Sequence, residues 1–81
     1  MKMAEAKQTF INGGLVSVFI VPAAMRKGWC VIIRPRLGDD SVLTSFRGET
    51  RWFRLIDAAY KAIEEIGFSS ATIRTFPPQH D

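Results

Sequence analysis

The seven residues from Leu15 to Val21 read LVSVFIV and restrict the fold of this chain more than any other stretch. Apolar side chains occupy both alternating sets of positions. Because successive side chains of a strand point to opposite faces, such a strand is covered on both sides. The run ends at Pro22 and is far shorter than the roughly 20 residues that cross a bilayer. We therefore expect a buried strand and no membrane segment.

The length and composition indicate one folded domain. The chain has 81 residues, of which 47% are hydrophobic and 23% charged, as is usual for a globular domain. We predict a single domain over residues 1–81, with residues 1–8 and 77–81 flexible. Cys30 is the single cysteine, which excludes an internal disulfide and a cysteine zinc site. This cysteine usage favours the reducing cytoplasm.

The remaining pattern predicts an α+β fold. Residues 29–36, 41–47, 50–54 and 71–76 have the alternation and flanking turns of further strands. Apolar residues recur at helical spacing across residues 55–66, and Gly67 is placed to end that helix in a left-handed conformation. We expect a mainly antiparallel sheet of four to five strands with one helix on one face, in the order β-β-β-β-α-β.

Two predicted turns set the strand register. A four-residue turn at Leu37 to Asp40 and a two-residue turn at Gly48-Glu49 sort the hairpin side chains onto two faces. The face predicted to meet the helix contains Trp29, Val31, Ile33, Val42, Thr44, Phe46 and Phe53. The opposite face contains Cys30, Ile32, Arg34, Arg36, Leu43, Ser45, Arg47, Trp52 and Arg54. Arg51 fits neither face.

The second face is the candidate binding surface. Its predicted site residues are Arg34, Arg36, Arg47, Trp52 and Arg54. The chain has a formal charge of +3, and residues 26–54 hold seven basic and three acidic residues, a local charge of +4. Guanidinium groups match phosphate oxygens, and an indole can stack on a base. The face is thus predicted to bind DNA; alternatively, its arginine stems cover the sheet and meet solvent or protein.

A second copy of the chain is the other predicted partner. The apolar strand needs cover on two faces, but one helix covers only one side of a sheet. A homodimer would supply the missing cover by edge pairing or by stacking of sheets. The alternative function is therefore a homodimeric protein-interaction or structural module with no nucleic-acid role.

No pattern in the sequence predicts an enzyme. Asp39-Asp40 reads as a turn, and Glu64 and Glu65 point about 100° apart on a helix, so neither pair forms a catalytic or metal site. Cys30 is interpreted as a small buried hydrophobe, with a reactive thiol near arginines as the alternative. We predict a non-enzymatic protein with no cofactor and no metal.

The chain shows two resemblances to known protein families. Gly28-Trp29 before a strand, a basic hairpin ending in Arg51-Trp52-Phe53, and a helix starting Asp57-Ala58-Ala59 resemble the arm-type DNA-binding domains of integrases. In that family the sheet face opposite the helix enters the major groove, which implies DNA contact by the five predicted site residues. Residues 28–67 also resemble short accessory proteins of bacterial plasmids and integrated mobile elements. This resemblance implies a mobile-element context more than an activity.

Overall fold

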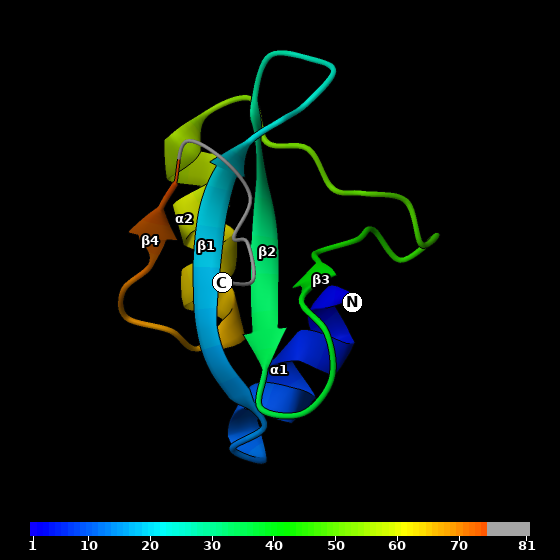
Figure 1. Cartoon of the computed structure of the whole chain (residues 1–81), viewed down its shortest axis with the longest axis vertical. Helices are drawn as coiled ribbons and strands as arrows, with labels where there is room; N and C mark the ends of the chain where they lie inside the picture. The colour runs from blue at the N-terminus through cyan, green and yellow to red at the C-terminus, as the bar shows by residue number, and fades with distance from the viewer. Residues whose placement is uncertain (75–81) are drawn as a thin grey trace.

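The computed structural model describes residues 1–74 as an α+β fold (Figure 1). Its elements in chain order are α1 (Met3–Ile11), β1 (Leu15–Pro22), β2 (Trp29–Pro35), β3 (Ser41–Val42), α2 (Ile56–Ile66) and β4 (Thr72–Ile73). The predicted strand 71–76 is confirmed only at Thr72–Ile73; its last two residues and the predicted flexible residues 77–81 lie outside the described part of the chain. Neither helix in residues 1–74 is long and apolar enough to span a membrane.

The four strands form one mixed sheet in the order β3-β2-β1-β4. Strand β1 runs antiparallel to β2, and β2 runs antiparallel to β3. Strand β4 runs parallel to β1, since the chain crosses the helical layer through α2 before it returns to the sheet. The α+β class and the helix near residues 55–66 are confirmed. The predicted order of helices and strands along the chain is wrong in two places. A helix precedes β1, and residues 50–54 form no continuous strand.

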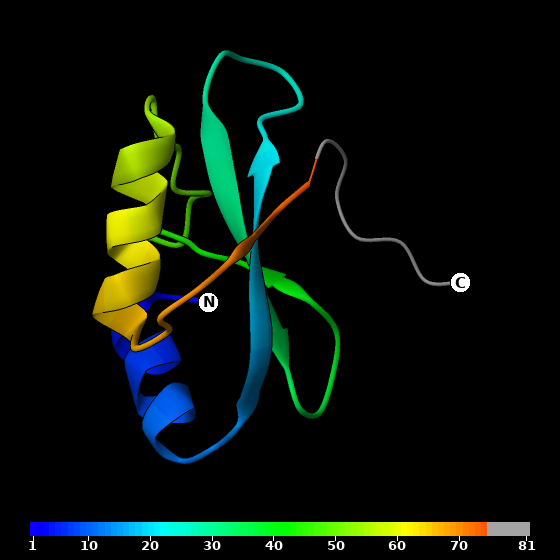
Figure 2. The same cartoon turned by 90° about the vertical axis from the view of Figure 1, so that its left-hand side faces the viewer.

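The main core lies between one face of the sheet and both helices, which Figure 2 shows on the same side. Strand residues Val18, Ile20, Val31 and Ile33 point into this layer and are almost fully buried. Helix α2 contributes the buried residues Ala59, Ala62, Ile63 and Ile66, whose spacing places them along one stripe. The sequence predicted these four residues, but it also placed Leu55 on the stripe, and Leu55 precedes α2 and is 65% exposed.

Residues 3–11 form a helix, although residues 1–8 were predicted to be flexible. Ala6 is fully buried, and Met3 and Phe10 pack against the same core. The spacing of these three residues is helical, but the stretch has only nine residues, so its stability depends on packing. An ion pair of 3.3 Å from Lys7 Nζ to Glu65 Oε2 also joins α1 to α2. The prediction of flexible residues was wrong because these contacts are with residues far along the chain, which a local pattern does not reveal.

Strand β1 is buried on both faces from Val18 to Val21, as its composition predicted, whereas Val16 is 53% exposed. On the side away from the helices, Phe19 and Val21 are 3% and 1% exposed. The guanidinium carbons of Arg34 and Arg74 each lie 4.8 Å from the Phe19 ring centroid. Arginine side chains of the same chain therefore cover Phe19, where we expected a second copy to provide the cover.

The predicted register between β2 and β3 is wrong. Ile32 pairs with Val42, three residues earlier than the predicted partner Ser45. An odd shift exchanges the two faces of a strand, so Leu43 is fully buried in the main core while Val42 packs on the opposite face. The backbone N–H of Arg36 donates to Gly14 O instead of extending this hairpin, which widens the connection.

The predicted two-residue turn at Gly48-Glu49 is also wrong. Thr44 bridges Thr50, and Ser45 N–H donates to Glu49 O at 2.7 Å, so the turn spans residues 45–49. The wider turn leaves Phe46 78% exposed, although it was predicted to lie under the helix. Phe53 is buried as predicted, because it exchanges backbone hydrogen bonds of 2.7 and 2.8 Å with Trp29.

Gly67 ends α2 as predicted, with φ of 135° and its N–H donating to Ile63 O at 3.2 Å. Phe68 then turns back and packs edge-on against Phe10 at 4.8 Å between ring centroids. A Cβ on Gly67 would lie 2.6 Å from two atoms of the Phe10 ring. The glycine therefore serves both the helix end and the contact between α1 and α2.

Gly67→Ala is expected to lower the free energy of unfolding by about 2–4 kcal/mol, from backbone strain and from the clash with Phe10. Gly38→Ala is the matched control, since Gly38 also has a positive φ (93°) but a Cβ there would meet no atom within 4 Å. Urea unfolding followed by circular dichroism measures both. Equal losses for the two variants would contradict a packing role for Gly67.

Candidate functional site

The five predicted site residues fall into two groups. Arg34 and Arg36 lie at the end of β2, and Arg36 Nε donates to Gly13 O at 3.1 Å, just before β1 begins. Arg47, Trp52 and Arg54 lie in the segment between β3 and α2, and Trp52 contacts Arg26, in the connection that follows β1. An eight-residue strand is roughly 25 Å long. The structure therefore places Arg36 and Trp52 at opposite ends of β1.

Arg34 is held by contacts within the chain. Its Nε and Nη2 donate to the two carboxylate oxygens of Asp40, each at 3.0 Å, and its guanidinium also lies over Phe19. Hydrogen bonding to Asp40 raises the pKa of the Arg34 guanidinium. A two-pronged carboxylate contact occupies the same N–H groups that would bind a phosphate. The geometry indicates a structural role for Arg34.

The arginines of residues 44–54 have a different environment. The Arg47 guanidinium lies 5.7 Å from the Phe46 ring centroid, and that of Arg51 lies 5.0 Å from the Phe53 ring. Arg26 lies 4.7 Å from the Trp52 ring. Within residues 1–74, none of these three arginines forms an ion pair with a carboxylate. An aromatic face orients a guanidinium without neutralising it, so its N–H groups stay available to an anion.

These side chains define the candidate site, which we call the basic surface. Its members are Arg26, Lys27, Arg47, Arg51 and Arg54, with the aromatic residues Phe46 and Trp52. These residues lie in two segments, 23–28 and 44–54. Glu49 is the one carboxylate in these segments, so five basic residues leave a formal charge of +4. Figure 1 shows residues 44–54 leaving the sheet and running outside it before α2 begins. The surface therefore projects from the sheet.

Backbone contacts hold this projecting segment at both ends. Thr44 N–H donates to Met1 O at 2.8 Å, and Arg51 N–H donates to Leu43 O at 3.0 Å. Near the other end, a Cβ on Gly28 would lie 2.7 Å from Phe53 O, so the close pairing of Trp29 and Phe53 requires glycine. The segment is thus fixed to the core while its central side chains face outward.

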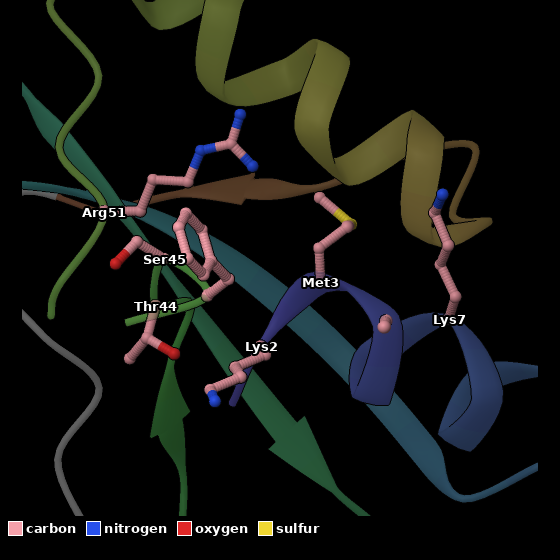
Figure 3. Close-up of a pocket in the computed structure, with 8 residues that line it drawn as sticks. Lys2, Met3, Lys7, Thr44, Ser45 and Arg51 are labelled. Atoms are coloured by element: carbon pink, nitrogen blue, oxygen red, sulfur yellow. The ribbon is translucent and has the colours of Figure 1, made fainter. Parts of the chain in front are cut away.

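A cavity of about 570 Å³ lies where α1 meets this segment. It is lined by Lys2, Met3, Ala4, Lys7, Thr44, Ser45, Phe46 and Arg51. Figure 3 shows Met3 of α1 and Arg51 of the segment extending toward the same space. The lining combines apolar side chains, two hydroxyl groups and three cations. Such a lining favours a flat apolar group that carries negative charge beside it.

Sequence reasoning did not assign several residues of this region to the site. Phe46 was predicted to lie in the core, but it is 78% exposed, and Lys27 was not selected. Arg51 was the misfit of the predicted register, and Arg26 and Lys2 lay outside the predicted strands. The register error hid Arg51, because the correct pairing with a turn at residues 45–49 places it beside the cavity. Lys2 was not recognised as a site residue, because helix α1, which begins at Met3, was not predicted.

Cys30 is buried at 8% exposure, as the sequence predicted. Burial raises the pKa of the Cys30 thiol, because the charged thiolate loses hydration. The neutral thiol is a poor nucleophile, which disfavours the alternative of a reactive cysteine. Across residues 1–74, no three side chains of His, Cys, Asp or Glu gather in a group that could hold a metal ion.

Comparison with models of protein families, with curated proteins and with solved structures finds no match for the chain. The resemblances to integrase arm domains and to plasmid accessory proteins therefore stay predictions from the sequence. The candidate site is defined by its geometry and charge alone.

Native Cys30 is expected to react with a thiol reagent at pH 8 more slowly than in the urea-unfolded chain, on the order of tenfold or more. The unfolded thiol also ionises at lower pH than the native thiol, so the free energy of unfolding should fall as pH rises above the unfolded pKa. Stopped-flow labelling of native and unfolded protein checks the first effect. Equal rates would show an accessible, reactive thiol.

Proposed function

We propose that this chain is a small non-enzymatic protein that binds nucleic acid, with DNA the expected partner, through the basic surface. The observation that carries the proposal is the pairing of exposed aromatic rings with arginines that have no carboxylate partner in residues 1–74. Phe46 and Trp52 are 78% and 38% exposed, and Arg47 and Arg26 lie over their rings.

The chemistry of these pairs suits a polyanion with planar bases. Each guanidinium presents a rigid fork of N–H groups that matches phosphate oxygens. An aromatic ring beside it offers a stacking surface to a base or an apolar contact to a sugar. The local charge of +4 supplies the attraction that draws a phosphate backbone to the surface.

The proposal changes the predicted set of contacts. Arg47, Trp52 and Arg54 remain in it, and Arg26 and Arg51 join them. Arg34 is assigned a structural role because its N–H groups bind Asp40. Arg36 lies at the other end of β1 and is assigned to the contact with Gly13.

The alternative, a homodimeric interaction or structural module, has weaker support. The edge strands β3 and β4 are two residues long each and offer little backbone for pairing with a second copy. Phe19, which was expected to need a partner chain, is covered by Arg34 and Arg74. The positively charged surface has no such internal cover, so it favours nucleic acid over protein.

Binding to a labelled DNA oligonucleotide should be salt-sensitive, and Arg47→Ala, Arg51→Ala and Arg54→Ala should each weaken it. Each lost phosphate contact is expected to reduce the slope of log affinity against log salt by about 0.7 for single strands and about 0.9 for duplex. Fluorescence anisotropy between about 50 and 200 mM salt measures the slope.

Lys61→Ala is the charge-matched control, because Lys61 lies on the exposed side of α2 and outside the basic surface. It should leave the slope unchanged. Arg36→Ala is a second control at the other end of β1. If the wild-type chain binds neither single-stranded nor duplex DNA at low salt, the proposed function fails.

Sedimentation velocity distinguishes the homodimer alternative from the proposed nucleic-acid-binding function. A monomer of 9.1 kDa is expected at micromolar concentration, with no change on Trp52→Ala, because the Trp52 ring contacts Arg26 of its own chain. A stable dimer that dissociates on Trp52→Ala would assign this surface to a protein interface instead.

A further inference from the structure

The cavity beside α1 shares two residues with the basic surface, Phe46 and Arg51. A strand of nucleic acid that follows the arginines of residues 44–54 would therefore pass the cavity mouth. The Phe46 ring is 78% exposed and lines the cavity, so it presents a stacking face at this point. A role for this cavity in binding a nucleotide rests on the proposed nucleic-acid function.

The lining of the cavity matches the parts of one nucleotide. Met3, Ala4 and Phe46 provide apolar and aromatic contact for a planar ring, and aromatic rings accept bases of any sequence. The side chains of Thr44 and Ser45 add hydroxyl groups, which can donate or accept hydrogen bonds at a base edge. The volume of about 570 Å³ lies within the range of small-molecule sites.

Basic side chains also line the cavity and could bind the phosphates of a nucleotide. Lys2, Lys7 and Arg51 all line the cavity. Lys7 also binds Glu65, at 3.3 Å, so part of its charge is balanced within the chain. Lys2 and Arg51 have no carboxylate partner among the described residues and remain able to bind phosphate oxygens. Charge complementarity thus favours an anionic ligand with a planar base over a neutral apolar ligand.

A base can enter this cavity only when it is unpaired. In a duplex, bases are stacked and hydrogen-bonded inside the helix, so moving one out costs its stacking and pairing energy. Single strands expose their bases to aromatic side chains without this cost. We propose that the cavity seats one unpaired base of single-stranded nucleic acid, stacked on Phe46, with the flanking phosphates bound by Lys2 and Arg51.

Three probes of equal length test this proposal by anisotropy at one low salt concentration. They are a single-stranded oligothymidine, an abasic oligonucleotide with the same phosphates but no bases, and a duplex. The oligothymidine should bind about 5- to 100-fold more tightly than the abasic strand, because only it supplies a stacking base. It should also bind more tightly than the duplex.

Phe46→Ala should remove most of this preference for oligothymidine and leave the affinity for the abasic strand unchanged. Phe46→Trp keeps a stacking ring and should retain the preference. Leu37→Ala is the matched control, because Leu37 is also strongly exposed, at 87%, but lies in the β2–β3 connection away from the cavity. Arg51→Ala should weaken all three probes, since it removes a phosphate contact.

The outcomes separate this inference from the proposed function. Salt-sensitive binding with equal affinity for oligothymidine and the abasic strand would overturn the base site and leave the nucleic-acid function standing. A preference that survives Phe46→Ala would also overturn the base site. Absence of binding to all three probes by the wild type would remove the proposed function, and the base site with it.

Discussion

Burial of β1 on both faces dictates how the other elements are arranged. Val18 and Ile20 face the helices, and Phe19 and Val21 face the other way. With β2 and β4 paired along its two edges, the strand is enclosed on four sides. Burial of these four apolar side chains removes a large apolar area from water, which is the main favourable term available to a domain of this size.

The need to cover the second face explains how the chain uses some of its arginines. Arg34 and Arg74 lay their guanidinium groups over Phe19, and Asp40 binds Arg34 with both carboxylate oxygens. Long arginine stems can shield an apolar ring while their charged ends stay near water. Part of the positive charge therefore serves the fold, and a count of arginines overstates the charge available to a partner.

The arginines near Phe46 and Trp52 differ from Arg34 in one physical respect, which is the absence of a carboxylate partner among residues 1–74. A carboxylate occupies N–H groups and cancels charge, whereas an aromatic face does neither. This difference, rather than the abundance of arginine, marks residues 44–54 as the candidate site. The cavity lies beside the same segment, where that segment meets α1.

Local sequence was sufficient for β1, β2, α2 and the glycine that ends α2, because each depends on periodicity or on a single backbone conformation. It was insufficient for α1, a nine-residue helix that is stabilised by packing of Ala6 and its neighbours on the core, and for the hairpin registers. A turn length wrong by an odd number of residues exchanges both faces of a strand. Leu43 and Phe46 were misplaced for this reason, and the predicted common face for five site residues came from the same error.

The order of apolar residues is enough to establish that β1 is buried on both faces and that a helix covers one of them. The order of charged residues likewise places the excess of positive charge in the middle of the chain. Which arginines are neutralised and which face outward depends on the folded arrangement. That arrangement depends on residues far apart in the sequence. Arg26 packs on the Trp52 ring, and Lys2 lines the cavity together with residues 44–46 and 51. No local pattern encodes these contacts.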